Sequence, residues 1–234
     1  KYLFTFNIRG DGSSKLHPDD QWGYFPSFSG AWRLSSEDFM KDLSWIDDLK
    51  IRGGWGQTGN QSGVGDYAYL QRYIIRREPW FEDGKANAVP GIIPENLRTA
   101  DLTWETTSQT NIGLDATLLK NRLTIGMDYY YKHTTDMLMY VEVPAGGGEI
   151  TSIVRNEGVM TNRGFEFSVN SRNMTGTFTW DTDFNISFNR NNLKSLELQK
   201  IYKAAQTTDA FHQTYIVRNE PGRPLGGFWG YISD

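Results

Sequence analysis

Side chains alternate strictly between two kinds from Thr177 to Asn191. Every second residue is apolar or aromatic apart from one threonine, namely Phe178, Trp180, Thr182, Phe184, Ile186 and Phe188. The residues between them are all polar, and they include Asp181 and Asp183. Successive residues of a β-strand point to opposite faces. The pattern therefore predicts a strand with one apolar face and one hydrophilic face.

The length of this strand favours a membrane-spanning sheet. The alternation covers about fifteen residues, whereas a strand of a globular protein has about 5–6. A transmembrane strand needs roughly 9–11 tilted residues. Length and alternation together indicate a barrel wall with lipid outside and water inside.

The same alternation recurs along the chain. It is present in residues 2–9, 27–34, 49–56, 111–118, 123–132 and 164–172, and weaker strands are expected at 67–76 and 215–218. A strand of a soluble β-sandwich also alternates, with its polar face in solvent. Alternation alone therefore leaves a soluble carbohydrate-binding sandwich open, and the connections and aromatic residues are needed to decide.

Short and long connections alternate along this strand order. The short ones are 119–122 and 173–176, with 35–48 intermediate, and the long ones are 11–24, 59–103, 137–161 and 194–222. Outer-membrane barrels have this asymmetry, with tight periplasmic turns and long outer loops. It favours an all-β fold, an antiparallel transmembrane β-barrel segment.

The large aromatic residues fall into two bands relative to these connections. Trp32, Trp45, Phe178 and Trp180 lie near the short turns, and Trp104, Tyr129 and Tyr131 lie towards the long loops. Aromatic girdles flank the lipid belt of membrane barrels in this way. We expect the first band at the periplasmic interface and the second at the outer one.

Composition excludes several classes of protein. The net charge of -4 argues against a nucleic-acid partner, because nucleic-acid binding needs a basic surface. The absence of cysteine removes thiolate metal sites and disulfides. No apolar run approaches the roughly 18 residues of a membrane helix, but barrel strands give a much weaker hydropathy signal.

A succession of short motifs makes the chain recognisable. In order along the chain, these are residues 9–14, 22–27, 31–34, 45–52, 56–60, 102–107, 111–115, 128–132, 161–166 and 222–226. The first reads Arg-Gly-Asp-Gly-Ser-Ser and the ninth Thr-Asn-Arg-Gly-Phe-Glu. The succession resembles the C-terminal barrel half of SusC/RagA-type TonB-linked outer-membrane transporters of Bacteroidota.

The resemblance implies how the whole protein is organised. It implies a 22-stranded barrel in the bacterial outer membrane, closed by a plug, with a SusD-like surface lipoprotein as a lid over the outer mouth. It also implies energy coupling through TonB, which would act on the plug region. We expect residues 1–234 to be part of a single outer-membrane β-barrel domain, with the plug domain and final strands absent from this chain.

Charged residues of the hydrophilic faces are expected to face the lumen. They are Arg9, Arg33, Arg52, Asp115, Asp128, Glu166, Arg172, Asp181 and Asp183. An arginine in the middle of the lipid face costs roughly 2–4 kcal/mol, so these side chains belong on the aqueous side. Each has two interpretations, contact with cargo or packing against the wall and plug.

Other motifs give no support for catalysis, a cofactor or a metal. Residues 54–59 match G-x-G-x-x-G, but a dinucleotide site needs a helix directly afterwards, and residues 60–65 continue as a loop. The three histidines lack ligand spacing. Asp11, Asp19 and Asp20 leave calcium in an outer loop open, without the spacing of a dedicated site. We therefore expect a protein that is not an enzyme.

The most site-like cluster lies in the longest loop. It consists of Trp80, Phe81, Glu82 and Asp83, in which an aromatic ring can stack on a sugar and carboxylates can bind its hydroxyls. Loop packing or contact with the lid lipoprotein is the alternative. The sequence as a whole predicts a TonB-dependent importer of oligosaccharides or oligopeptides in contact with outer-membrane lipid. A passive porin or surface-assembly barrel remains the main rival.

Overall fold

The computed structural model describes residues 1–82, 85–99, 101–143, 150, 152–197, 202–206 and 215–230. For residues 76–82, 85–90, 202–206 and 215 it describes the backbone. The strands are β1 (Tyr2–Gly12), β2 (Trp22–Arg33), β3 (Ile46–Asn60), β4 (Tyr73–Glu82), β5 (Lys85–Pro94), β6 (Glu105–Leu118), β7 (Leu123–Glu142), β8 (Ser152–Thr175), β9 (Thr179–Leu196), β10 (Tyr202–Gln206), β11 (Tyr215–Asn219) and β12 (Gly227–Phe228). Two short 3-10 helices, Leu34–Ser36 and Asp38–Met40, connect β2 to β3.

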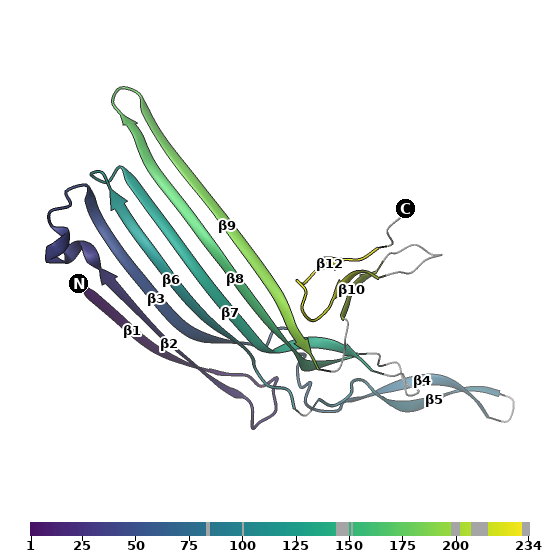
Figure 1. Ribbon diagram of the computed structural model, residues 1–234. Coiled ribbons are helices and arrows are strands. Elements are labelled where there is room, and N and C mark those ends of the chain that lie inside the picture. Colours follow the sequence, from purple (N-terminus) through teal and green to yellow (C-terminus); the bar gives the residue numbers. More distant parts are fainter. Residues whose placement is uncertain are drawn as a thin grey trace.

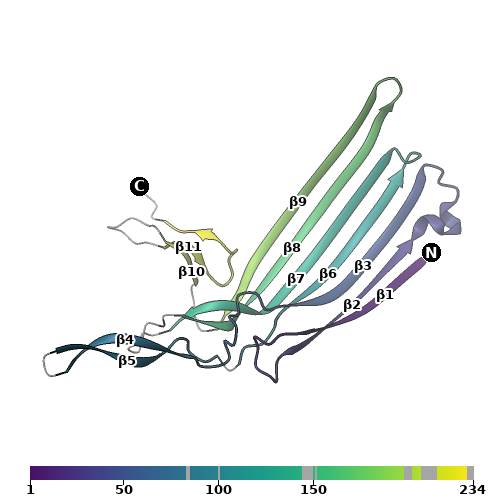
Figure 2. The same ribbon diagram turned by 180° about the vertical axis from the view of Figure 1, so that it is seen from behind.

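Seven long strands form one antiparallel sheet in the order β1-β2-β3-β6-β7-β8-β9. Figure 1 shows them side by side, with the short turns at one end of the sheet and the long connections at the other. Seen from behind in Figure 2, the sheet is again a single layer. Within the described part of the chain, no second sheet covers either face, so the β-sandwich alternative does not fit.

The ends of several strands differ from the sequence-based expectation. We expected a long loop over 137–161, but β7 runs to Glu142 and β8 begins at Ser152, so most of this segment is paired strand. The 59–103 connection contains the hairpin β4–β5, in which β4 starts at Tyr73. In both cases the chain lies beyond the apolar belt. The alternation of apolar and polar residues ends there, so the sequence pattern no longer indicates a strand.

A small apolar core lies under the long connections. Leu16, Val64 and Leu102 are buried against one another, with Trp104 and Leu138 packed beside them. This core joins the β1–β2 and β3–β6 connections to the wall. The described residues contain no helix with the length and hydrophobicity needed to cross a membrane.

Trp104 corrects one of the expected aromatic bands. Instead of facing lipid, it packs edge-on against Phe25, with ring centroids 5.7 Å apart, and joins the apolar core. Trp104 does lie at the long-connection end of the wall, directly before β6. Its side chain, however, turns to the hydrophilic face, where Phe25 lies. The outer aromatic band therefore does not include Trp104.

Candidate functional site

Strand register gathers the apolar residues on one face of the sheet. One cross-strand row runs Tyr2, Trp32, Ile51, Leu114, Met127, Phe167 and Ile186, and the next runs Phe4, Gly30, Gly53, Ile112, Tyr129, Phe165 and Phe188. Many of these side chains are exposed, among them Phe4 at 84% and Phe188 at 61%. Exposure of large apolar side chains across a whole face indicates a surface that meets lipid or another apolar partner.

The height of this apolar face matches a bilayer. On β9 it extends from Trp180 to Phe188, a path of nine residues that rises about 3.3 Å per residue. With a strand tilt of about 40°, this path corresponds to roughly 20–23 Å along the membrane normal. Bulky side chains at both ends extend it to the apolar band of about 25 Å that is typical of outer-membrane barrels.

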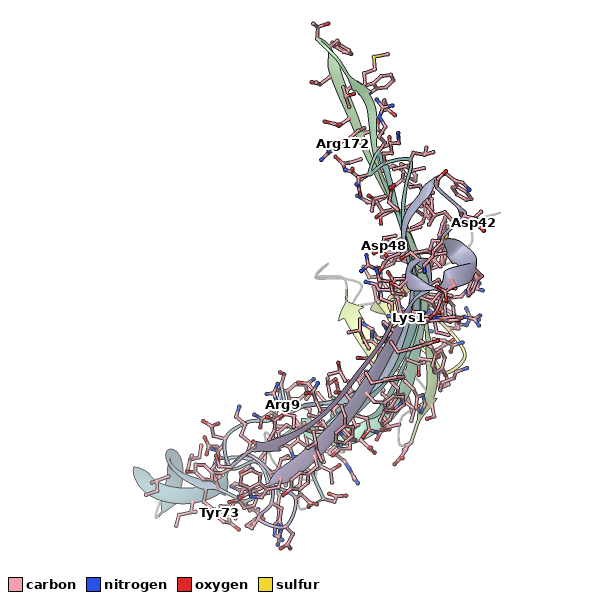
Figure 3. The ribbon with its side chains drawn as sticks, turned by 90° about the vertical axis from the view of Figure 1, so that its left-hand side faces the viewer. Lys1, Arg9, Asp42, Asp48, Tyr73 and Arg172 are labelled. Carbon is pink, nitrogen blue, oxygen red and sulfur yellow. The ribbon has the colours of Figure 1, made fainter. Side chains whose placement is uncertain are left out.

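The opposite face is hydrophilic and concave. Figure 3 shows the sheet curved along its strands, with Arg9, Asp48 and Arg172 on the concave side. Register places all the predicted lumen residues on this same face: Arg9, Arg33, Arg52, Asp115, Asp128, Glu166, Arg172, Asp181 and Asp183. That they line the lumen of a closed barrel stays a prediction.

Four of the charged side chains on this face form one network. Arg52 contacts Asp128 at 2.6 Å and Asp115 at 3.1 Å, and Lys50 contacts Asp115 at 2.8 Å. The side chains of Lys50, Arg52, Asp115 and Asp128 are between 28% and 37% exposed. Alternating charges therefore link β3, β6 and β7 on the hydrophilic face, and each side chain stays partly exposed.

A glycine makes this network possible. Gly113 lies between Arg52 and Asp128 in the cross-strand row, and a Cβ at this position would approach Arg52 Cζ and Asp128 Oδ1 to 2.7 Å. Because no side chain occupies that place, the guanidinium crosses β6 to reach a carboxylate two strands away. The sequence pattern alone did not single out Gly113 or Lys50.

The remaining predicted charges have local or cross-strand neighbours. Arg9 contacts Asp11 at 2.8 Å, Arg33 contacts Asp48 at 2.7 Å, and Asp183 accepts a hydrogen bond from Asn170. Arg172 lies opposite Asp181 on the neighbouring strand, and Glu166 lies opposite Asp128. The structure thus joins the charges of β3, β6 and β7 in one network. The other predicted charges lie outside this network, in separate pairs.

An open groove lies beside the network on the same face. It has a volume of about 450 Å³, and its lining combines hydroxyl and amide side chains with Arg9, the aromatic residues Phe25, Phe28 and Trp55, and the glycines Gly54 and Gly56. The glycines come from the G-x-G-x-x-G motif, which lies entirely within β3. Because these glycines have no side chain, the wall is hollowed at this point. Such a lining supplies hydrogen-bonding groups together with aromatic surface.

The loop cluster that we singled out lies at the end of the β4–β5 hairpin. The backbone of Trp80, Phe81 and Glu82 belongs to β4, opposite residues 85–87 of β5. Their side chains and all of Asp83 lie outside the described residues. Their role in substrate binding stays a prediction. In the described part of the chain, no group of three acidic or histidine side chains is arranged to hold a metal ion.

Comparison with known proteins identifies the fold. The family model described as TonB dependent receptor-like, beta-barrel matches residues 1–221. The chain is 39% identical to the TonB-dependent receptor SusC of Bacteroides thetaiotaomicron, covering 99% of this chain and 23% of that protein. It is 36% identical to the TonB-dependent receptor P3 of Formosa agariphila, again covering 99% and 23%. The chain thus spans about a quarter of these relatives.

Solved structures agree with this assignment. The chain superposes on the RagAB peptide importer in the closed-closed state with a TM-score of 0.80 and 26% identity, over 95% of this chain and 23% of that one. The open-open state gives a TM-score of 0.77. The two-faced curved wall, the alternating connections and these matches lead to one conclusion: the chain belongs to the TonB-dependent receptor-like β-barrel family of the bacterial outer membrane.

Proposed function

We propose that this chain is part of the wall of an energy-coupled importer of oligosaccharides or oligopeptides. The observation that carries the proposal is the division of one curved sheet into a lipid-height apolar face and a concave face of charges, hydroxyls and amides. A passive porin has such a wall too. Similarity to receptors named for TonB dependence supports active uptake over passive flow.

Uptake by cells that carry the full-length protein tests the proposal. Fluorescent oligosaccharides and oligopeptides are offered to cells with and without a protonophore, and to cells that lack TonB. We expect both treatments to abolish uptake, because opening a plugged barrel needs energy from the inner membrane. Uptake that continues unchanged in both conditions would establish the passive-porin alternative.

The hairpin β4–β5 supports the presence of a lid partner. Figure 1 shows it projecting from the long-connection end of the sheet. Its described base carries Tyr73, Ile75 and Ile92, which are 60%, 74% and 72% exposed, and Ile75 pairs directly with Ile92. Exposed apolar patches mark interaction sites. We assign this patch to contact with a SusD-like surface lipoprotein.

Association of the two proteins can be measured separately from transport. In the full-length protein, Ile75→Asp with Ile92→Asp is expected to lower co-purification of the neighbouring lipoprotein at least tenfold. Tyr67→Ser is the matched control, because Tyr67 is also exposed in this connection but lies outside the hairpin. Equal co-purification from all three proteins would refute the assignment.

The tip of the hairpin is proposed to contact cargo. Trp80 and Phe81 would stack on a ring, and Glu82 and Asp83 would accept hydrogen bonds from hydroxyl or amide groups. Trp80→Ala is expected to lower uptake while leaving lipoprotein co-purification unchanged. Loss of co-purification without a separate effect on cargo binding would instead place the tip in the lid interface.

A further inference from the structure

Two arginines lie side by side on the apolar face. Arg163 of β8 is directly opposite Arg190 of β9, and the next pair on the same face is Phe165 with Phe188. Both arginine side chains are exposed. Directly opposed residues have Cβ atoms about 5 Å apart, and like charges in that arrangement destabilise a sheet. The pair therefore calls for a compensating negative charge.

The described residues provide no such charge on this face. Arginines of β2 and β3 do have acidic partners. Arg33 contacts Asp48, and Arg52 contacts Asp128. Neither Arg163 nor Arg190 has an ion pair or hydrogen-bond partner among the residues that the structure describes. Across the sheet, Arg163 is flanked by Tyr131, which is not an acidic residue.

The position of the pair places it at the outer lipid interface. On β9 the apolar series from Trp180 ends at Phe188, and Arg190 is the next residue on that face towards the long-connection end. In outer-membrane barrels the long connections are extracellular, so this end meets the outer leaflet. Tyr131, which is 40% exposed, lies in the same row, and tyrosine is enriched at the headgroup level of membranes.

We propose that Arg163 and Arg190 bind the phosphate of a lipid A-type glycolipid in the outer leaflet. Arginine forms bidentate charge-assisted hydrogen bonds with phosphate, and two guanidinium groups from neighbouring strands hold one phosphate between them. The acyl chains of the same lipid then lie along Phe165 and Phe188, directly below on the same face. Headgroup and tails are thus recognised by consecutive rows of one sheet surface.

Lipid retention by the full-length protein tests this site. The wild type and the double variant Arg163→Gln, Arg190→Gln are purified from outer membranes in mild detergent, and bound lipid A is counted by native mass spectrometry. We expect at least a tenfold lower lipid A content in the double variant. The variant Arg172→Gln is the control for loss of an arginine on the opposite face of β8, and its lipid A content is expected to stay within twofold of wild type.

Rebinding in nanodiscs separates the phosphate from the acyl chains and from other anions. The wild type is offered lipid A, dephosphorylated lipid A or phosphatidylglycerol, and only lipid A is expected to be retained, with retention weakening at high salt. Equal retention of dephosphorylated lipid A or of phosphatidylglycerol would overturn the assignment, as would undiminished lipid A on the double variant. If the double variant does not fold, Arg163→Lys with Arg190→Lys keeps both charges but cannot form the bidentate contact, and its lipid A content is expected to fall below that of the wild type. Unaltered lipid A retention by that folded protein would again overturn the assignment.

Discussion

The assignment of the two faces can be tested with one pair of neighbouring substitutions. Phe167 and Ser168 are consecutive residues at the same depth of β8, but Phe167 lies between Met127 and Ile186 on the apolar face. Ser168 lies between Gly126 and Asn185 on the hydrophilic face. We predict that Phe167→Arg strongly destabilises the protein in a membrane and that Ser168→Arg does not.

The expected magnitudes follow from the surroundings of each residue. An arginine on the lipid face near mid-depth costs roughly 2–4 kcal/mol. Loss of the edge-on ring contact between Phe167 and Phe184, whose centroids are 6.5 Å apart, adds about 1 kcal/mol. The free energy of unfolding of Phe167→Arg is therefore expected to fall by about 3–5 kcal/mol.

An arginine at position 168 enters a very different environment. Ser168 borders a hollow of about 310 Å³ that is also lined by Asp128 and Glu166. The longer side chain has room there, and its charge meets carboxylates. Because such partly exposed pairs contribute only about 0–1 kcal/mol, we expect a change within about 1 kcal/mol of wild type.

The measurement is reversible unfolding of the full-length protein in lipid vesicles, followed by tryptophan fluorescence against guanidinium concentration. Both variants carry the same added charge, so a general effect of charge on insertion cancels between them. A larger loss of stability for Ser168→Arg than for Phe167→Arg would show that the hydrophilic face meets lipid and would refute the assignment of the faces.

Three further outcomes are expected from the same unfolding assay. Gly113→Val is expected to cost about 1–3 kcal/mol, because its side chain would displace Arg52 from Asp128; an unchanged midpoint would contradict this close approach. A double-mutant cycle of Arg52→Gln and Asp128→Asn is expected to give a coupling of about 1 kcal/mol, since the pair at 2.6 Å is one-third exposed, and additive effects would show that the contact is not formed. At the short-turn end, the hydrogen bond from Lys1 lowers the pKa of Glu37. The contribution of Glu37 to the free energy of unfolding is therefore complete above the ordinary carboxyl pKa and is lost as the pH falls through the lowered pKa. Glu37→Gln should be less stable than wild type at pH 7 and equal to it in strong acid. A stability difference that does not depend on pH would contradict the contact.

Much of the wall could be predicted from local patterns. A period of two is a property of consecutive residues, so the faces of β1, β2, β3, β6, β7, β8 and β9 follow from the sequence once each segment is taken as a strand. The alternation of short and long connections is also visible along the chain. The resemblance to a family of outer-membrane transporters rests on motifs that are linear in the sequence, and the comparisons confirm it.

Signals fail where the environment of the chain changes. Beyond the apolar belt, both faces of β7 and β8 meet water or protein, so residues 137–161 lose the alternation although they remain paired strands. For the same reason the strand expected at 67–76 overlaps β4 only at Tyr73–Arg76, and its partner β5 was not predicted. Trp104 was assigned to lipid because aromatic type and position cannot distinguish an interfacial girdle from a small core under loops, and its contact with Phe25 depends on packing.

The sequence by itself therefore determined the membrane-barrel character of this protein, the location of the seven long wall strands and the sides to which their residues point. Only the tertiary structure decided which residues stand beside one another across strands. Gly113 between Arg52 and Asp128, and Arg163 opposite Arg190, join segments far apart in the chain. The physical reason is that side-chain alternation depends on consecutive residues, whereas register depends on hydrogen bonds between separate strands. A shift of one residue in register would change the cross-strand neighbour of every residue.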